Sequence, residues 1–486
     1  MCDVTRLLRR PGDTITLHAA AAAAGGAATP STAAAITADT AAAAATTAAA
    51  AAPTGATTTA AAVDDTVAPP ASATIPQVMS IEWDEVATGS DAATAAVWAA
   101  YSAAGLGVLL VRHVPGLEPL RSRTLRAIHD IAALEGDAAV AAAVARREVG
   151  LGSDVPVRAV GSSKPRGGKA APPPPPQAAG DTVTATLQFK WEALPPPPPP
   201  SASAGASGGA GTEAAASYPS SSAAEAAAGL KEDMVALGHL LTNVSAAVAG
   251  ACDACVSARF PHCAAAPSLR AACVDAHTAK ARLIHYRAGA SPCATAHGRA
   301  LAALGGWQAW HYDYGLLTAL VSPTLSPAPP PASPPPPPCG LVVLYCGGGA
   351  LPPTPVLIDI PPDAVAVQVG EAAEVLTGGA LVATPHCVAR PCTCSDTPAA
   401  AAAAEAAAAI SRQIFVVFNQ VPWAAPMAPP EGVPPDPRRH AQDAALAAIL
   451  PPLASRLAPG MTFSDFSTAT TRAYYARGGG MQSTTL

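Results

Sequence analysis

The sequence predicts an α+β fold of mainly β character, in which a helical N-terminal region precedes a double-stranded β-helix, the jelly-roll form of a β-barrel. Helical patterns dominate residues 75–270, whereas short β-rich runs between Gly- and Pro-rich turns dominate residues 271–430. Because these runs do not alternate with helices, they favour a barrel or a double-sheet jelly roll over a parallel sheet.

Low-complexity segments bound and interrupt these two regions. Residues 1–74 are rich in Ala and Thr, and we expect them to be disordered because they cannot bury enough apolar area to offset the entropy of ordering. Insertions rich in Pro, Gly and Ser fall at about residues 160–226, and a Pro-rich insertion falls at residues 323–338. Residues 431–486 are expected to form a helical or irregular C-terminal tail.

The N-terminal region is expected to begin with a helix–strand–helix unit, because apolar residues such as Leu125 and Ile128 recur at helical spacing. The helices are expected at residues 92–104, 117–134 and 227–256, and the strands at residues 107–114 and 184–191. The following β-rich region is expected to contain strands at residues 282–286, 310–321, 341–345, 356–360, 364–369, 380–388 and 413–420.

Composition excludes several classes of function. The formal net charge is −6 and only 13% of the residues are charged, so no basic field is available for nucleic acid. The Ala/Thr stretch at residues 40–62 lacks Leu, Ile and Phe and contains Pro53, which argues against a membrane span. We therefore expect a cytoplasmic protein; Arg6, Arg9 and Arg10 leave a plastid address as the alternative.

The cysteines are expected to be reduced thiols. There are 11 of them, an odd number spread over a long chain without a secretory signal. Cys252 and Cys255 form a CxxC, but no second pair stands at zinc-finger spacing, so no role is assigned to them.

A metal site is predicted in the β-rich region. His311 and Asp313 stand two residues apart in a β-like run, so a strand would turn both to one face and Tyr312 to the other. Two His and one carboxylate on one side of an octahedral Fe(II) leave the other side open for a co-substrate and O₂. The best third ligand is His386, which a hairpin-like turn at Gly378-Gly379 would bring beside the first pair.

The segments around these residues resemble the isopenicillin N synthase-like branch of the 2-oxoglutarate and Fe(II)-dependent oxygenases. That family shows an HxD, then a V-G-[DE] block with a following [ST]-x-G, and then an [AS]-T-x-H-x-V strand. Here the three pieces occur in order, around His311, at Val369-Gly370-Glu371 and at Ala383–Val388. The resemblance extends from Ile75 to about Gln420 and is strongest to a poorly characterised plant-type subgroup.

The resemblance implies Fe(II) as the metal, 2-oxoglutarate as the co-substrate and ascorbate as an optional reductant. Tyr286 and Arg412 match the family's co-substrate residues, and a guanidinium such as that of Arg412 can donate two parallel hydrogen bonds to a carboxylate. Ile284 and Ile414 replace the Asn and the Ser or Thr of the family pattern, and Arg390 is a rival anchor. No further catalytic side chain is predicted.

The resemblance thus implies a dioxygenase that couples 2-oxoglutarate decarboxylation to oxidation, by default hydroxylation, of a small organic substrate with O₂. Desaturation or ring closure would use the same site. The alternative is a catalytically inactive metal-binding jelly roll that serves as a scaffold, with its Pro-rich tracts docking to partners that bind Pro-rich motifs. Ile284 and Ile414 favour this alternative, whereas the intact metal triad favours the enzyme.

Overall fold

The computed structural model describes residues 10–11, 14–17, 71–102, 104–133, 182–190, 223–261, 268–276, 278–289, 304, 306–327, 339–347, 352–391, 408–431 and 437–476. The chain divides into two compact units, residues 14–73 and the remainder. In the N-terminal region that we expected to be disordered, two short strands, β1 (Thr14–Leu17) and β2 (Ala71–Thr74), pair with each other. The Pro-rich tracts at residues 172–176, 195–200 and 334–338 lie outside the described residues.

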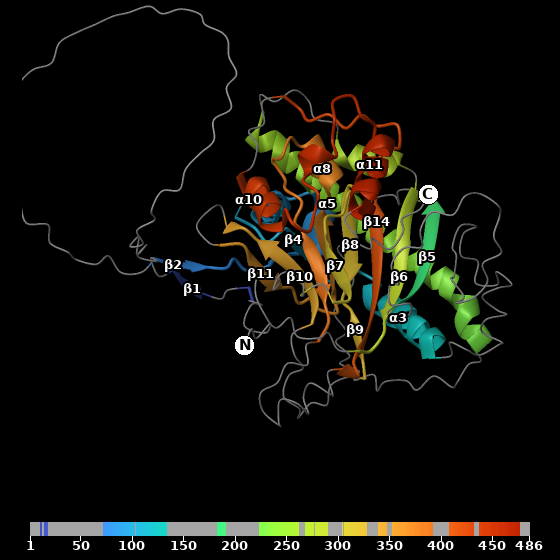
Figure 1. Cartoon of the computed structure of the whole chain (residues 1–486). Coiled ribbons are helices and arrows are strands. Elements are labelled where there is room, and N and C mark those ends of the chain that lie inside the picture. Colours follow the sequence, from blue (N-terminus) through green and yellow to red (C-terminus); the bar gives the residue numbers. More distant parts are fainter. Residues whose placement is uncertain are drawn as a thin grey trace, which may run out of the picture. The chain divides into compact units, whose positions relative to one another are not determined.

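The larger unit combines helices with two β-sheets (Figure 1). Its helices are α1 (Trp83–Thr88), α2 (Asp91–Tyr101), α3 (Leu117–Ala133), α5 (Ala223–Arg259), α6 (Leu269–Asp275), α8 (Glu371–Leu376), α10 (Pro437–Leu446), the 3₁₀ turn η3 (Leu453–Ser455) and α11 (Phe463–Ala476). Serine caps begin two of them: Ser90 accepts from the Ala93 amide and Ser268 from the Ala271 amide. The predicted mixture of helices and sheets is confirmed.

The first sheet has eight strands in the order β3-β4-β12-β8-β14-β6-β5, with β9 also paired to β14. All pairings are antiparallel except that of β3 with β4. The strands are β3 (Met79–Glu82), β4 (Val108–Arg112), β5 (Thr182–Lys190), β6 (Thr278–Tyr286), β8 (Leu317–Val321), β9 (Thr324–Ser326), β12 (Ala364–Val369) and β14 (Ser411–Asn419).

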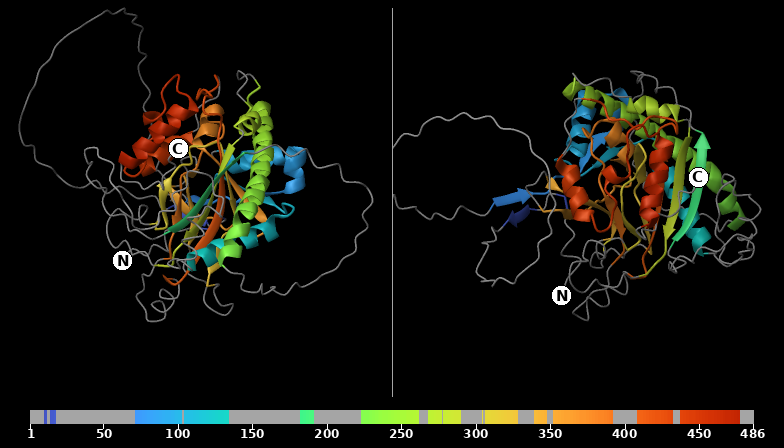
Figure 2. Two further views of the ribbon diagram at one scale, coloured as in Figure 1. Left: turned by 90° about the vertical axis from the view of Figure 1, so that its right-hand side faces the viewer. Right: turned by 45° about the horizontal axis from the view of Figure 1, so that its top comes forward.

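One face of this sheet packs against helices. Its buried side chains, among them Leu283, Val367 and Phe415, belong to one hydrophobic core with Leu237 and Leu241 of α5. Figure 2 shows α5 running along this side of the sheet. Because side chains alternate along a strand, the residues between these core positions turn to the opposite face, which we call the inner face.

The second sheet has four strands, β11 (Thr354–Leu357), β10 (Gly340–Tyr345), β13 (His386–Ala389) and β7 (Gln308–His311), in that order. Its outer side chains, including Trp310 and Val342, pack on Leu446, Leu450 and Tyr474 in and beside the C-terminal helices. The two sheets are joined where the Tyr286 hydroxyl of β6 donates to Gln308 Oε1 of β7, 3.0 Å away. The second sheet holds both predicted metal-binding histidines, since β7 ends at His311 and β13 begins at His386.

Three local predictions need correction. The run at residues 310–321 is not one strand: β7 ends at His311, and β8 begins at Leu317. Gly378-Gly379 do not form a hairpin turn, because they follow the short helix α8 and the flanking strands β12 and β13 belong to different sheets. The predicted insertion at 323–338 begins too early, since β9 pairs with β14.

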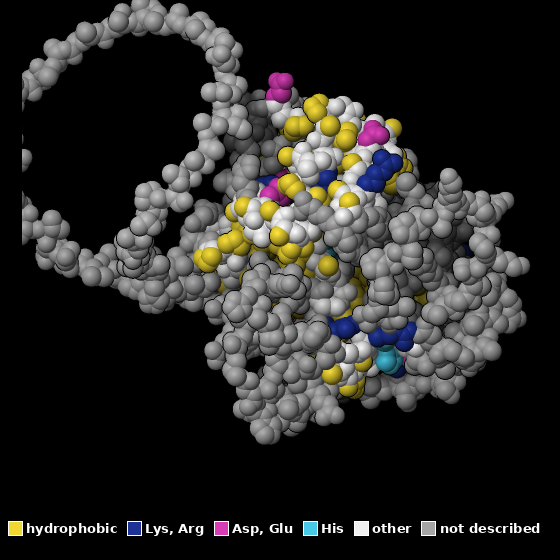
Figure 3. Space-filling model, viewed as in Figure 1, with side chains coloured by type: hydrophobic (Ala, Val, Ile, Leu, Met, Phe, Trp, Pro, Cys, Tyr) yellow, Lys and Arg dark blue, Asp and Glu magenta, His cyan; other side chains and the backbone are white. Residues whose placement is uncertain are grey.

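Helix α5 is long and apolar enough over Gly229–Arg259 to cross a membrane by length and composition. In this fold the same apolar residues are core residues: Met234, Leu237, Leu241 and Val244 are fully buried. Burial against α2, α3 and the first sheet accounts for the hydropathy of the helix. Figure 3 shows hydrophobic side chains over much of the described part of this face and few charged ones, with some Lys or Arg side chains beside a His near the lower edge.

Candidate metal centre

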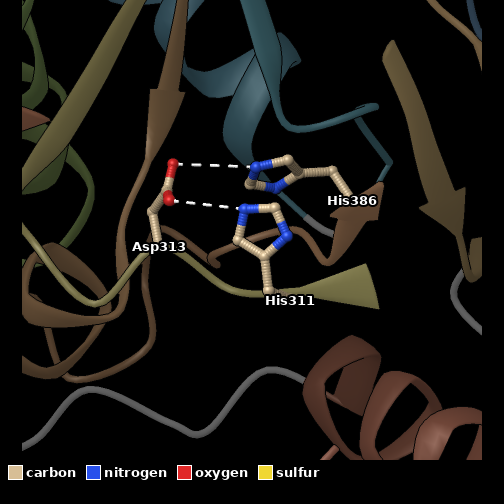
Figure 4. Close-up of side chains that lie close together, drawn as sticks. All are labelled: His311, Asp313 and His386. Carbon is tan, nitrogen blue, oxygen red and sulfur yellow. Dashed lines mark ion pairs between the residues drawn. The ribbon is translucent and has the colours of Figure 1, made fainter. Parts of the chain in front are cut away.

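The pairing of β13 with β7 places His386 directly opposite His311. Their ring centroids are 4.2 Å apart, and both residues are buried. Figure 4 shows the Asp313 carboxylate turned toward both imidazoles. The distances are 3.7 Å from Asp313 Oδ1 to His311 Nε2 and 3.7 Å from Asp313 Oδ2 to His386 Nε2. The structure thus brings together the three residues that the sequence analysis selected.

We had expected His311 and Asp313 to share one strand. In the structure β7 ends at His311, and Asp313 lies two residues past that end. Helix α8 holds its loop through backbone contacts. The amide of Glu371 donates to the carbonyl oxygen of Asp313, and that of Ala372 donates to the carbonyl oxygen of Gly315. These amides are among the first of a helix, which have no partner within it. A Cβ on Gly370 would stand 2.1 Å from the Gly315 oxygen, so the close approach requires glycine.

Local contacts prepare both imidazoles to act as ligands. His311 Nδ1 lies 2.9 Å from the carbonyl oxygen of Ala309, and His386 Nδ1 lies 3.2 Å from that of Thr384. Because a carbonyl oxygen can only accept, each Nδ1 carries the hydrogen, and the lone pair that could bind a metal lies on Nε2. Burial, followed by the neighbouring His386, lowers the pKa of His311 to about 4. His311 is therefore neutral near pH 7, the form that binds a metal.

The donor set fits a metal ion. Among the described residues this is a group of three whose ligand atoms all lie within 4.8 Å of one another. Asp313 Oδ2 is buried without a hydrogen-bond partner, an unfavourable state for a carboxylate oxygen. Ligands bound at roughly 2.1 Å on neighbouring corners of an octahedron lie about 3 Å apart. Small side-chain rotations would close the observed separations of 3.7 Å around a cation.

Arg412 and Tyr286 lie directly opposite each other in the pairing of β14 with β6. The Arg412 guanidinium carbon stands 5.5 Å from the centre of the Tyr286 ring. Arg412 is only 1% exposed, and its Nε and Nη1 have no hydrogen-bond partner among the described residues. Burial lowers the pKa of Arg412, while Tyr286 and Cys339 oppose the shift. A buried guanidinium with open donors fits a carboxylate ligand.

The row next to this pair is apolar. Ile414 and Ile284 lie opposite each other, and both are buried on the inner face. Neither isoleucine offers a hydrogen bond beside Arg412 and Tyr286. The rival anchor Arg390 lies just after β13, beside Gly289. It is less buried than Arg412.

Sequence reasoning missed Gln308, which connects the two parts of the site. Its Oε1 accepts from the Tyr286 hydroxyl at 3.0 Å, and its amide nitrogen lies 3.1 Å from His311 Nε2. The signal in the sequence was a lone amide between Trp307 and Trp310, in a strand that is otherwise apolar up to His311.

Sequence reasoning also missed a buried ion network that we call the C-terminal clamp: Glu371, Glu374, Arg439 and Arg456. Arg456 donates from both terminal nitrogens to the Glu371 carboxylate, at 2.6 and 2.7 Å. Arg439 donates to Glu371 at 2.7 Å and to Glu374 at 2.9 Å. Although burial alone would raise it, the two guanidinium groups bring the pKa of Glu371 below its usual value.

The clamp reaches both metal-binding segments. Arg439 stacks over the ring of Tyr312, 4.1 Å from its centre, and the Tyr312 amide donates to the Tyr474 hydroxyl at 3.0 Å. Glu374 Oε2 accepts from the amide of Ala383, three residues before His386, at 3.0 Å. The tail residues Arg439 and Tyr474 thus contact the segment of His311 and Asp313 directly, whereas Arg439 reaches the segment before His386 through Glu374 of α8.

No protein-family model matches the sequence, and no curated protein matches it. Solved structures with some similarity include a full-length Neurospora crassa protein in complex with α-ketoglutarate, at 15% identity over 83% of this chain and 96% of that chain, with a TM-score of 0.40. Rice dioxygenase for auxin oxidation (DAO) is 15% identical over 73% and 87%, with a TM-score of 0.38. JOX2 in complex with 2OG, Fe and JA is 14% identical over 81% and 84%, with a TM-score of 0.42. Function is therefore inferred from the residues of the site.

Proposed function

We propose that the protein is a non-haem Fe(II)- and 2-oxoglutarate-dependent dioxygenase that oxidises a small organic substrate, by default through hydroxylation. The supporting observation is a buried group of two His and one Asp together with the open donors of a buried arginine, Arg412. The inner faces of the two sheets would then form a distorted jelly roll of the isopenicillin N synthase-like, plant-type kind. We propose the cytoplasm as its location, with the plastid as the alternative.

His311, Asp313 and His386 would hold the iron, and Arg412 with Tyr286 would hold the distal carboxylate of 2-oxoglutarate. The bound iron and co-substrate supply the oxidising chemistry: one oxygen atom of O₂ enters the substrate, the other enters succinate, and CO₂ leaves. The protein binds and orients the reactants and keeps water away. Burial of the two histidines and of Arg412 supports that role.

A second candidate is supported by the apolar pair Ile284 and Ile414, which removes polar groups from the co-substrate region. In this case the jelly roll would bind a metal without turnover and serve as a scaffold, with its Pro-rich tracts as docking segments.

One experiment separates the two candidates. The full-length protein is titrated with Fe(II) without oxygen and then with 2-oxoglutarate, and succinate is measured after O₂ is admitted with a metabolite library, with ascorbate as an optional reductant. Fe(II) binding, 2-oxoglutarate binding and iron-dependent succinate release are expected. Stoichiometric Fe(II) binding without 2-oxoglutarate binding or succinate release would favour the scaffold.

A further inference from the structure

A β-bulge in β7 turns Gln308 toward the metal centre. In the pairing of β13 with β7, His386 lies opposite His311 and Val388 lies opposite Gln308, so β7 has one residue more than β13 over this stretch. In a regular strand, the side chains of Gln308 and His311 would point to opposite faces. The extra residue brings both to the same face, and bulges often redirect a side chain in this way beside an active site.

The hydrogen atoms of His311 fix the direction of the Gln308 amide. Since His311 Nδ1 donates to the carbonyl oxygen of Ala309, 2.9 Å away, Nε2 carries a lone pair and can only accept. The Gln308 amide nitrogen, 3.1 Å from Nε2, is therefore the donor in that contact. At the other end of the amide, Oε1 accepts from the Tyr286 hydroxyl at 3.0 Å. Gln308 is thus held at both ends, by a candidate metal ligand and by a candidate co-substrate residue.

A metal ion and the Gln308 amide compete for the same lone pair. The lone pair of a neutral imidazole nitrogen either accepts a hydrogen bond or coordinates a metal. The hydrogen bond from Gln308 to His311 Nε2 would therefore break when iron binds at that atom. The amide would stay beside the metal, because the Tyr286 hydroxyl holds its oxygen. Its N–H groups would then need a new acceptor at this half-buried position.

The metal-bound end of the co-substrate offers that acceptor. Tyr286, which holds the Gln308 oxygen, also lies against Arg412, whose guanidinium carbon is 5.5 Å from the centre of the Tyr286 ring. Gln308 therefore stands between His311 and the proposed anchor of the distal carboxylate. A 2-oxo diacid that reaches from the metal to Arg412 would present the oxygen atoms of its metal-bound end to the Gln308 amide, and these oxygen atoms can only accept.

We propose that Gln308 is a positioning residue that changes its hydrogen-bond acceptor during loading. It donates to His311 before iron binds, and to the metal-bound end of 2-oxoglutarate afterwards. This inference rests on the proposed function, which supplies the iron and the co-substrate. It adds a polar contact from β7 in a region where Ile284 and Ile414 offer none. Gln308 thus opposes the binding of the metal and favours the binding of the co-substrate.

These two opposed effects distinguish a positioning role from a structural one. Gln308→Leu removes the amide and leaves His311 Nε2 without a competing donor. Its Fe(II) affinity, titrated by calorimetry without oxygen, should therefore rise by up to about tenfold and should not fall. In the Fe(II)-loaded protein the same variant should weaken 2-oxoglutarate binding by roughly two- to tenfold, the equivalent of one hydrogen bond. A side chain that only joined the two sheets would lower both affinities when replaced.

Two further variants make the result specific. Gln308→Glu keeps the oxygen that accepts from Tyr286 and removes the donor, so it should weaken 2-oxoglutarate binding at least as much as Gln308→Leu does. It keeps the test decisive if circular dichroism shows that Gln308→Leu does not fold. Gln77→Leu, at an exposed glutamine just before β3, is the matched control and should leave both affinities unchanged.

Lower Fe(II) affinity or unchanged 2-oxoglutarate affinity in Gln308→Leu would overturn the inference and leave the proposed function intact. If that variant does not fold, unchanged 2-oxoglutarate affinity in Gln308→Glu would do the same. Failure of the unmodified protein to bind Fe(II) or 2-oxoglutarate, measured first, would instead overturn the proposed function and the inference with it.

Discussion

His386 faces His311 across the antiparallel strands β13 and β7, and the two buried rings are 4.2 Å apart. Two imidazole rings so close gain little from each other. Among the described residues, Asp313 supplies the carboxylate next to both Nε2 atoms, and its oxygens lie 3.7 Å from each of them. The arrangement is unfavourable without a cation and favourable with one. A metal ion would therefore stabilise this group of side chains.

The first prediction concerns these ligands. Replacing His311, Asp313 or His386 by Ala should lower Fe(II) affinity by more than about 100-fold, because loss of an outer partner of a ligand alone costs roughly 10–100-fold. The fold should survive, since the side chains face the site. Calorimetric Fe(II) titration and circular dichroism measure the two effects. His113→Asn, at an exposed histidine with φ of 54°, is the matched control. Normal iron affinity in any of the three would remove that residue from the site.

The second prediction separates the two arginines. Arg412→Gln should weaken 2-oxoglutarate binding by roughly 2–5 kcal/mol, the range for removing one half of a buried charge pair. Arg390→Gln should have much less effect, because Arg390 is less buried. Binding constants for 2-oxoglutarate in the Fe(II)-loaded protein decide between them. If Arg412→Gln left 2-oxoglutarate binding unchanged and Arg390→Gln weakened it, the anchor would lie on the segment after β13 instead of on β14.

The third prediction restores a hydroxyl to the co-substrate region. Ile414→Ser should tighten 2-oxoglutarate binding by about 0.5–3 kcal/mol, since Ile414 shares the inner face with Arg412 and one hydrogen bond has this value. The variant should be less stable without ligand because it loses buried apolar area. Ile414→Val, which adds no donor, is the control. Equal 2-oxoglutarate affinity in both variants would show that Ile414 does not border the co-substrate.

The order of the three candidate ligands was readable from the sequence because a short motif carries it, and alternation in β-rich runs indicated which residues share the inner face. The position of Asp313 could not be predicted from the sequence, because it depends on backbone hydrogen bonds between α8 and the loop at Gly315. The clamp could not be foreseen either. Glu371 and Arg456 are 85 positions apart, and nothing local in the sequence pairs them.

The fourth prediction concerns the C-terminal clamp. Arg456→Met should lower the free energy of unfolding by roughly 3–5 kcal/mol, because it leaves Glu371, whose side chain is fully buried, short of a charge partner. The double variant Arg456→Met with Glu371→Gln should recover part of the loss, which a double-mutant cycle measures. Arg472→Met, at an exposed position of α11, is the control. If the effects of the two substitutions on the free energy of unfolding simply add, the Arg456–Glu371 pair makes no coupled contribution to stability.

The last prediction is a pH dependence of stability that arises from His285. This buried histidine lies beside His129, with ring centroids 5.8 Å apart, and its Nδ1 is 3.1 Å from the amide nitrogen of Gln413. That amide also donates to Ser411 Oγ, so Gln413 presents donors and favours the neutral imidazole. Burial, and then His129, lower the pKa of His285 to about 4.

The sign follows from proton uptake. Between the usual histidine pKa of about 6.5 and the folded value of about 4, the unfolded chain binds a proton that the folded chain does not. The contribution of His285 to stability is therefore complete above pH 6.5 and falls as the pH drops toward 4, by an amount on the order of 1–3 kcal/mol. His285→Gln should remove this part of the dependence in urea unfolding at a series of pH values. An unchanged slope between pH 6.5 and 4 in that variant would assign the dependence to other groups.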